Sequence, residues 1–379
     1  MPTYHFIPKA PLMFRDSRPF GANEHAETLG FPLPSTLAGA LRTMYGDENN
    51  FDYVKDVEKL LKETVTGPLF TRTSTKTNNT ELLFPAPADS VVFDQVNGTA
   101  CVSRLTPQVI AASEGVDLPD NLQPVGLKTS NQDKPTKNPP RFWLKDKLVD
   151  WLIDDSSDQI EAGDLGERAI PIETRTHIAI DKTTLAAENG KLFQTACLDF
   201  GEQYIEEGNQ KNWNGFSYGL LATSTLDISK AYRKLGGESR LAYVERDDAL
   251  WPTCPEKLQS VLTNVKNFRL QFVTPAIFGE GWKPAWLDDN LTGKIPETNI
   301  DVILKAIALP RWQAVSGWDM QKQNHGQRPT RRMVPAGAVY WFEIRNNFKT
   351  DISKLWMKCI TDERKSDGFG LVVPGVWNK

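Results

Sequence analysis

The sequence predicts an α+β fold in two halves, in which strands outnumber helices. Residues 170–180 alternate apolar or β-branched side chains with polar ones, which is the period of a half-buried strand. Residues 338–344 form a short, strongly apolar run typical of a buried strand, whereas helical spacing is confined to a few short stretches. Strands that do not alternate regularly with helices favour α+β domains over a doubly wound parallel sheet.

Composition limits the class of protein. The chain has 379 residues, enough for about two domains, and its 40% hydrophobic and 24% charged residues are typical of a packed globular protein. The formal net charge of −4 argues against nucleic-acid binding driven by bulk charge, so any such binding must use local basic patches. No segment is typical of a signal peptide or a membrane span, so we expect a cytoplasmic protein without membrane contact.

The first half begins with a strand and a helix. Residues 3–7 alternate as a strand does, and a long loop rich in proline and glycine follows. The next helix is expected over 34–45, with Ser35 or Thr36 as its N-cap and Gly46 as its end.

Three further stretches of the first half differ in character. Residues 52–64 carry apolar side chains at helical spacing and predict an amphipathic helix. Residues 128–147 have a net charge of +4 and three prolines, which indicates either an extended cationic insertion or an ordinary solvated loop. Residues 150–167 carry seven acids and neither Lys nor Arg, so we expect them to face solvent or a basic protein rather than RNA.

A hairpin is the clearest strand signal in the chain. Its arms are expected at 170–180 and 191–200, joined by a turn at 188–190. A short helix after Pro255 is the expected junction between the halves.

The second half repeats the mixture of strands and helix. Strands are expected at 268–272, 302–309, 338–344 and 371–373, and an amphipathic helix at 351–360.

Two glycine-dependent loops, 235–240 and 367–375, are candidates for holding a phosphate. Paired glycines allow positive φ and bring backbone N–H groups together, although each loop read singly is more often a tight turn. The spacing G-x-G-x-x-x-x-G so near the end of the sequence leaves no room for a dinucleotide-binding unit. Residues 311–332 have a net charge of +4 with Trp312 and Trp318 interleaved, which suits single-stranded nucleic acid or an exposed loop.

Histidine and cysteine give little sign of catalysis or metal binding. The four histidines, His5, His25, His177 and His325, form no pair at metal-ligand spacing, and the four cysteines are widely separated. Each histidine is more typical of a structural or exposed residue, but His25 keeps open a role as general base in a metal-free RNA cleavage. We expect no catalytic residue, no metal and no cofactor.

Six segments occur in one order over nearly the whole chain. They are residues 11–21, the helical segment 31–42, the hairpin strand 173–181, the glycine loop 236–240, the segment 316–319 and the glycines at 368–370. Together they resemble the RAMP superfamily, specifically the subunit of type III-B (Cmr) CRISPR effector complexes that holds the 5′ tag of the guide RNA. The type III-A counterpart shares the same architecture.

The resemblance implies two ferredoxin-like, RRM-related domains. The first, residues 1–250, would carry an insertion and a thumb hairpin, and the second, residues 260–379, would carry a glycine-rich loop. The thumb would push between guide and target and displace a base pair.

The resemblance also implies a groove for the tag. A helix N-terminus and backbone nests favour phosphate, and a glycine on the helix lets a ribose or base come near. The RNA-binding residues implied in this way are Arg15, Arg18, Ser35, Thr36, Gly39, Arg42, Arg175, His177, Lys182, Gly236, Gly237, Arg240, Arg331, Gly368 and Gly370.

The implied partners are the crRNA 5′ tag, the large polymerase-like cyclase subunit, the adjacent backbone RAMP subunit, and target RNA near the thumb hairpin. The resulting expectation is a non-catalytic RNA-binding scaffold. A rival is a metal-independent RAMP endoribonuclease that processes precursor crRNA, in which His25 or His177 would serve as base. A subunit that only contacts protein is disfavoured by the basic segments and glycine loops together.

Overall fold

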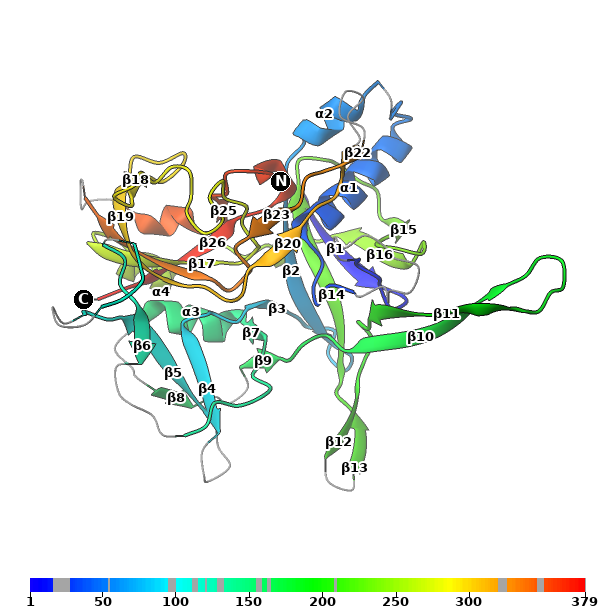
Figure 1. Cartoon of the computed structure of the whole chain (residues 1–379), viewed down its shortest axis with the longest axis horizontal. Helices are drawn as coiled ribbons and strands as arrows, with labels where there is room; N and C mark the ends of the chain where they lie inside the picture. The colour runs from blue at the N-terminus through cyan, green and yellow to red at the C-terminus, as the bar shows by residue number, and fades with distance from the viewer. Residues whose placement is uncertain are drawn as a thin grey trace. The chain divides into compact units, whose positions relative to one another are not determined.

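The computed structural model confirms a mixed α+β chain with mostly strands and few helices (Figure 1). It describes residues 1–15, 28–53, 55–94, 100–110, 115–119, 121–127, 133–154, 159–161, 165–207, 210–319, 326–345 and 351–378. The chain divides into two compact units, each made of three stretches. Unit 1 comprises Met1–Thr80, Ala169–Leu250 and Ala314–Thr330, and unit 2 comprises Glu81–Arg168, Trp251–Gln313 and Arg331–Lys379.

Unit 1 is built on a twisted antiparallel sheet. Its elements are β1 (Thr3–Pro8), α1 (Pro34–Glu48), α2 (Val57–Lys62), β2 (Val65–Ser74), β10 (Ile172–Ile180), β11 (Ala187–Leu198), β12 (Tyr204–Glu207), β13 (Gln210–Trp213), β14 (Phe216–Ser224), β15 (Ala231–Lys234), β16 (Leu241–Arg246), the 3-10 turn η1 (Asp248–Leu250), β21 (Trp318–Asp319) and β22 (Gly326–Gln327). The strand order is β15-β16-β1-β14-β2, with every neighbouring pair antiparallel. Numbered along the chain, the four main strands β1, β2, β14 and β16 therefore lie in the order 4-1-3-2.

The expected first helix is present, but it begins and ends differently. No side chain caps its N-terminus, so Ser35 and Thr36 do not act as caps, and Pro34 instead occupies the first turn, where its fixed φ suits a helix. The helix also continues past Gly46 to Glu48. Its buried residues, including Leu37 and Leu41, form the face that packs against β2.

The second expected helix, 52–64, is shorter than predicted. Only α2, Val57–Lys62, is helical, and Val57 and Leu60 are its buried residues. A helix of six residues is marginal in isolation, so it depends on the packing of these two buried side chains.

The hairpin of β10 and β11 is confirmed, but its turn was misplaced. The chain reverses at 181–186, where Asp181 Oδ1 accepts hydrogen bonds from the backbone N–H groups of Thr183 (2.9 Å) and Thr184 (2.7 Å). The predicted turn at 188–190 lies within β11, in the stretch where the register shifts between Ile178 and Ile180. Gly190 takes a φ of +74° there, so the glycine signal marks an irregularity in the strand.

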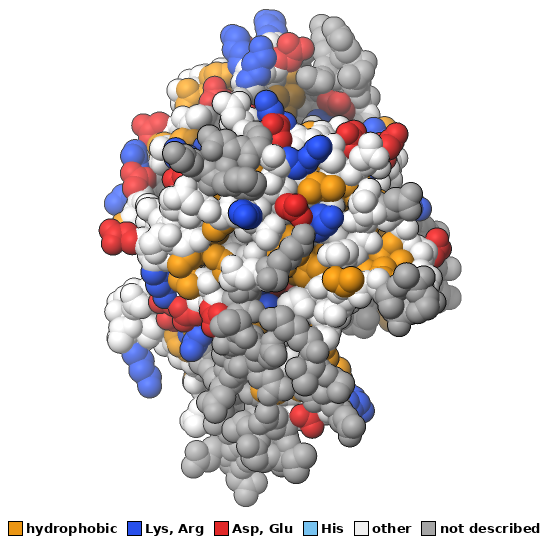
Figure 2. Space-filling view, turned by 90° about the vertical axis from the view of Figure 1, so that its left-hand side faces the viewer, with side chains coloured by type: hydrophobic (Ala, Val, Ile, Leu, Met, Phe, Trp, Pro, Cys, Tyr) orange, Lys and Arg blue, Asp and Glu red, His pale blue; other side chains and the backbone are white. Residues whose placement is uncertain are grey.

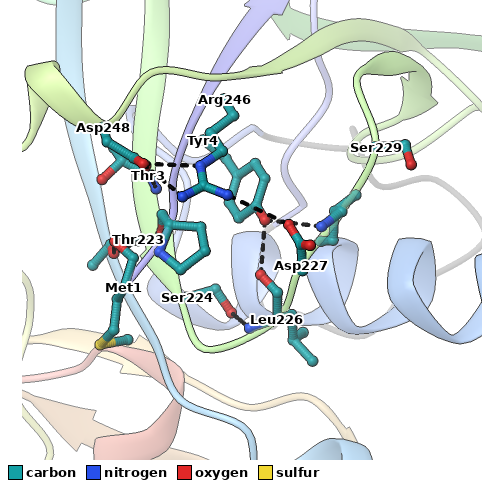
Figure 3. Close-up of polar contacts among 12 residues, drawn as sticks. Met1, Thr3, Tyr4, Thr223, Ser224, Leu226, Asp227, Ser229, Arg246 and Asp248 are labelled. Carbon is teal, nitrogen blue, oxygen red and sulfur yellow. Dashed lines mark hydrogen bonds and ion pairs between the residues drawn. The ribbon is translucent and has the colours of Figure 1, made fainter.

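A polar network holds the first strand of unit 1 in place (Figure 3). The hydroxyl of Tyr4 donates to the carbonyl of Leu226 at 2.7 Å, and burial raises the pKa of Tyr4. Arg246 Nη2 donates to Asp248 Oδ2 at 2.7 Å, and Asp248 Oδ1 accepts from the backbone N–H of Thr3 at 2.8 Å. These bonds tie β1 to the turn after β14 and to the end of β16.

Unit 2 contains a second antiparallel sheet. Its elements are β4 (Ser90–Asp94), β5 (Ala100–Pro107), β6 (Val125–Leu127), β7 (Phe142–Leu144), α3 (Lys145–Ile153), β8 (Gln159–Glu161), β9 (Gly166–Glu167), α4 (Glu256–Val261), β17 (Asn267–Phe272), β18 (Thr292–Lys294), β19 (Asp301–Ala308), β23 (Arg331–Met333), β24 (Val339–Ile344), η2 (Ile352–Leu355), β25 (Lys358–Cys359), η3 (Lys365–Asp367) and β26 (Leu371–Val376); β3 (Thr80–Pro85) and β20 (Gln313–Val315) lie where the chain passes between units. The strand order is β18-β19-β24-β17-β26-β25. The strands β17, β19, β24 and β26 again give the order 4-1-3-2, and their neighbouring pairs are antiparallel.

Both faces of this sheet are covered. On one face Phe268 stacks on Phe342, with ring centroids 5.6 Å apart, and Phe272 meets Tyr340 edge-on at 5.1 Å. The other face carries Arg269, which pairs in register with Trp341 and lies against the C-terminal part of α3.

A buried ionic cluster fixes α3 to this second face. Asp89 Oδ2 accepts from Arg269 Nη1 at 3.0 Å and lies 3.5 Å from Arg104 Nη1, and Asp89 Oδ1 accepts from Trp151 Nε1 at 2.9 Å. The guanidinium of Arg104 lies over the ring of Trp151, 3.5 Å from its centroid. All four side chains are almost fully buried.

Two expectations for unit 2 were wrong. The stretch expected to be acidic and exposed includes the end of α3, where Trp151 and Leu152 are core residues, because the helix turns its apolar side inward. The helix expected at 351–360 is a single 3-10 turn at 352–355. Met357, with a φ of +57°, leaves helical geometry, and its N–H donates to Val372 O at 2.8 Å, so sheet pairing replaces the helix.

Candidate nucleic-acid interface

The loop between β15 and β16, Leu235–Arg240, is the most unusual backbone segment of unit 1, and we call it the glycine loop. Three of its residues have left-handed backbone: Gly236 (φ +75°), Glu238 (φ +55°) and Ser239 (φ +54°). The loop closes through a hydrogen bond from Leu235 N to Arg240 O, 2.9 Å. Left-handed non-glycine residues are costly and are concentrated at functional sites.

The glycine loop packs closely on the segment that follows β1. Gly237 N donates to Met13 O at 2.8 Å, and a Cβ on Gly236 would lie 2.5 Å from that same carbonyl. A side chain at 236 is therefore excluded by Met13 as well as by its φ. Arg15 is exposed two residues after Met13, the residue on which Gly236 and Gly237 pack.

The base of the β10–β11 hairpin completes this cluster. Arg175 forms an ion pair with Glu173, and Arg240 pairs with Glu238 at 2.8 Å. The hydrogen bond from Arg175 holds the pKa of Glu173 below its usual value. Burial raises the pKa of the Cys197 thiol, and the charges of the nearby Arg240 and Glu238 lower and raise that pKa, respectively. Arg175 and Arg240, 65 positions apart in sequence, thus belong to one site. We call the set Arg15, Glu173, Arg175 and the glycine loop the glycine-loop site.

The two acidic residues of this site were missed by the sequence analysis. Each stands two positions before its arginine, in Glu173-Thr174-Arg175 and in Glu238-Ser239-Arg240. In the strand pair Glu173 and Arg175 this pattern was a usable signal, because residues two apart in an extended strand share a face; Glu238 and Arg240 lie in a loop, where the spacing gives no such signal. Each carboxylate can orient the guanidinium of its arginine. The other N–H donors of that guanidinium can then bind a further partner.

The helical residues of the predicted groove lie in unit 1 but are not equivalent. Ser35 and Thr36 are half-buried in the first turn of α1, and Gly39 is exposed with open space where a Cβ would stand. Arg42 is buried, and its Nη2 donates to the carbonyl of Glu63 at 2.7 Å. Arg42 therefore braces α1 against the chain after α2.

The hairpin body carries the other two predicted residues of unit 1. His177 Nε2 lies 2.9 Å from Thr195 Oγ1, and its ring stacks on Phe193 at a centroid distance of 5.2 Å. Lys182 is exposed in the turn, roughly 20 Å along the strand from Arg175. The hairpin extends away from the sheet of unit 1 (Figure 1).

Three predicted residues belong to unit 2. Arg331 is 55% exposed at its side chain and lies 3.5 Å from Glu363. Gly368 and Gly370 are buried in the turn before β26: Gly370 N donates to Pro275 O at 2.7 Å, and a Cβ on Gly370 would lie 2.6 Å from Thr361. This second glycine-rich loop has the geometry of a packed turn, which was the other reading of its sequence.

Arg18, His25 and His325 lie outside the described residues. In the basic segment, Arg332 lies over the ring of Trp312, 4.9 Å from its centroid. Within the described ranges no three His, Cys, Asp or Glu side chains gather as metal ligands would. No helix in this part of the chain is long and apolar enough to cross a membrane.

Charge on the molecular surface is mixed. Figure 2 shows one face, on which Lys and Arg side chains are interspersed with Asp and Glu among the coloured atoms. This agrees with the net charge of −4, and it means that attraction for a polyanion must come from local clusters.

The sequence matches the family model of CRISPR-associated protein (Cas_Cmr3) over residues 4–377. None of the curated proteins matches it. Two cryo-EM structures of the Type III-B Cmr-beta, both bound to cognate target RNA and one of them also to AMPPnP in state 1, each contain a similar chain with 16% identity and a TM-score of 0.46. In each case the match covers 89% of this chain and 86% of that chain.

Proposed function

Because the chain belongs to the CRISPR-associated protein (Cas_Cmr3) family, and is thus a component of a type III-B Cmr CRISPR complex, we propose that it is the subunit that anchors the 5′ tag of the guide RNA. The glycine-loop site is the observation that supports this role. It combines an exposed, left-handed backbone turn with Arg15, Arg175 and Arg240. Gly237 N is bonded to Met13 O, so the N–H groups that this turn can direct at a phosphate are those of Glu238 and Ser239. Guanidinium groups recognise phosphate through paired donors.

The proposed RNA path uses unit 1. The tag passes over the glycine loop and the base of the β10–β11 hairpin, with its phosphates toward the arginines. The exposed face of α1 at Gly39 leaves room for a ribose or a base. Further along, the hairpin meets the target RNA and displaces a base pair, with its turn at 181–186 as the intruding tip.

The fold supports two ferredoxin-like units in this proposal. The order 4-1-3-2 with all neighbours antiparallel occurs in both sheets, and α1 provides the crossover between β1 and β2 in unit 1. Among the described residues, the corresponding connections elsewhere contain short strands or 3-10 turns in place of an α-helix, so the likeness lies in strand order more than in helices.

The proposed role is non-catalytic and depends on partners. The large polymerase-like cyclase subunit and the adjacent backbone RAMP subunit would complete the groove, in the cytoplasm where guide and target RNAs meet. A chain of net charge −4 fits a scaffold whose RNA groove is shared with its neighbours.

The anchoring role is tested in the assembled complex with variants of the glycine loop that remove a positive charge, remove a negative charge or add a negative charge. Arg240→Ala should weaken binding of tag-containing RNA about tenfold, because it removes a charge-assisted phosphate contact. Glu238→Gln should strengthen binding or leave it unchanged, because it removes an anion from the same loop. Gly237→Asp should weaken it by adding one. Filter binding of tagged and tagless guides measures all three, with Lys257→Ala on α4 as the surface control.

Equal affinities of the wild type and Arg240→Ala for tagged RNA would refute the anchoring site. The non-catalytic role has its own assay, in which the purified subunit is incubated with repeat RNA in EDTA. Intact RNA is the expected result. Cleavage that His177→Ala or His25→Ala abolishes would instead establish the endoribonuclease.

A further inference from the structure

Two tyrosines form a row across one face of the sheet of unit 1. Tyr232 on β15 is the register partner of Tyr243 on β16, and Tyr243 in turn is the register partner of Ile7 on β1. The two rings lie 5.1 Å apart between centroids and are tilted by 56°. Tyr232 is 61% exposed, which is unusual for a large ring already paired with another.

The row lies on the face of the sheet opposite α1. Side chains alternate along β15, and Arg233, next to Tyr232, forms an ion pair with Glu48 at the end of α1. Tyr232 and Lys234 therefore point to the other face, where Tyr243 lies with them. Among the described residues no helix of unit 1 pairs its side chains with these tyrosines.

Charge around the row favours a polyanion. Lys234 and Lys230 are exposed on either side of Tyr232 along the chain, and Lys9 is exposed where its N–H bonds to Leu241 O at 3.0 Å. The acidic residue that shares this face of β16 is Glu245, two positions beyond Tyr243 and register partner of His5. Lysines beside an exposed aromatic ring suit single-stranded nucleic acid, whose bases stack while its phosphates meet cations.

The row is continuous with the glycine-loop site. β15 ends at Lys234 and the glycine loop begins at Leu235, so Tyr232 lies roughly 13 Å along the chain from Gly236. An RNA strand that contacts Arg240 and the left-handed turn can therefore reach the row while it stays on β15, β16 and the glycine loop that joins them.

We propose that Tyr232 and Tyr243 form a stacking platform for one unpaired nucleobase of the RNA that passes the glycine-loop site. This inference rests on the proposed function and adds base contact to a site otherwise built for phosphate. The phenol rings supply a π-face that accepts any base, and Lys234 supplies a cation for the adjoining phosphate. The platform fixes the position of the strand without dictating its sequence.

The chain contains a matched control pair. Tyr204 and Trp213 are register partners on β12 and β13, with centroids 5.3 Å apart and exposures of 51% and 62%. Both rings of this pair are exposed, and the charges beside it in sequence are mixed: Glu202 and Glu206 flank Tyr204, and Lys211 stands two positions before Trp213. A generic effect of exposed rings would appear at both pairs, whereas the platform is specific to the first.

The experiment uses the assembled complex and guide RNAs that carry 2-aminopurine at successive positions of the 5′ tag. Stacking on a tyrosine quenches the probe at one position in the wild type. Tyr232→Ala should restore its fluorescence there and weaken RNA binding about tenfold. Tyr232→Phe should retain both quenching and affinity, because it keeps the ring and removes only the hydroxyl. Trp213→Ala should change neither.

The outcomes separate this inference from the proposed function. If Tyr232→Ala leaves quenching and affinity unchanged while Arg240→Ala still weakens binding, the platform is refuted and the anchoring role stands. If neither variant weakens binding, both proposals fail. If Tyr232→Ala instead releases a protein subunit from the complex and RNA binding is intact, the row is a protein contact, and the inference is wrong.

Discussion

Asp89 illustrates how much can depend on a single buried residue. Its carboxylate faces two buried arginines, Arg104 and Arg269, and also accepts from Trp151. Asp89→Ala would leave two buried cations without their anion, so we expect the free energy of unfolding to fall by about 3–5 kcal/mol. Urea titration followed by tryptophan fluorescence measures this loss.

Asp150→Ala is the matched control for that measurement. Asp150 pairs with Lys257 at 2.7 Å, but both side chains are more than half exposed, so its loss should cost less than about 1 kcal/mol. Similar costs for the two variants would show that the cluster around Asp89 does not stabilise the fold.

His5 gives the stability a defined pH dependence. It is buried beside Thr71 Oγ1 at 2.9 Å, and burial lowers its pKa to about 4, against a small opposing effect of Asp247. The unfolded chain takes up the proton below about pH 6.5, whereas the folded protein does so only near pH 4. The free energy of unfolding should therefore fall by up to about 3 kcal/mol as the pH drops from 6.5 to 4.

The His5 contribution is isolated by comparing unfolding curves of the wild type and His5→Asn at pH 5 and pH 7.5. The variant lacks the titrating group, so its stability should change less between the two conditions. Parallel losses in both proteins would assign the acid sensitivity to other groups.

At the scale of elements, two glycines on the proposed RNA path should respond oppositely to the same change. Gly236→Ala places a side chain at φ +75° against Met13 and should destabilise the protein by at least about 1–2 kcal/mol. Gly39→Ala lies in an exposed part of α1 with open space and should stabilise it by up to about 1 kcal/mol. Thermal unfolding of both variants tests the pair, and stabilisation by Gly236→Ala would contradict the packing of the glycine loop.

The β10–β11 hairpin is an element with little support of its own. It is a separate two-stranded sheet, and Ile178, Leu192 and Phe193 are all about half exposed or more. Two strands with exposed apolar side chains are marginal in water, which suggests that partners cover them in the complex.

Shortening the tip of this hairpin should separate its role from that of the base. Replacing 183–185 by a two-residue turn should alter the spacing of target pairing or cleavage in the assembled complex. Affinity for the tag should be unchanged, because Arg175 and Glu173 lie at the other end of the hairpin. Loss of tag binding would contradict this division.

Sequence patterns predicted which strands exist more accurately than they predicted the positions of turns and helices. Strands with strong alternation or apolar runs, such as β10 and β24, were predicted within a few residues because these patterns are local; β24 is buried as its apolar run indicates, whereas β10 has no buried residue. The turn of the hairpin was misplaced because Asp181 forms a turn without glycine, while Gly190 serves a strand irregularity. The helix expected at 351–360 was lost to pairing with β26, which no local pattern reveals.

For the whole molecule, the sequence predicted two α+β halves but not how the chain is shared between them. Unit 2 takes residues 81–168 from the first half, and its cluster joins Asp89 to Arg269 across 180 positions. Likewise, the sequence did not reveal that Arg175 and Arg240 lie near the same Glu173 and Cys197, because spacing carries no information about contacts so distant. The burial of Arg42 and Gly370 also needed the folded environment.

The net charge of the whole chain bears on how RNA binding depends on salt, because a net negative chain must attract phosphates through local cationic residues. With a net charge of −4, affinity should depend on the few arginines of the glycine-loop site. The slope of log affinity against log salt should become shallower by about 0.7 for each of Arg15, Arg175 and Arg240 replaced by Gln. Titrations of the assembled complex at several salt concentrations measure this. An unchanged slope in the triple variant would place the phosphate contacts elsewhere.

The first strand of unit 1 has its sheet neighbours far along the chain. Within the described ranges, the strands that pair with β1 are β14 and β16, which begin more than 200 residues later. At about 5–20 residues per second, the ribosome needs on the order of ten seconds or more to deliver those strands. During that interval a newly made β1 has exposed edges on both sides, so protection by a chaperone during translation would be most valuable there.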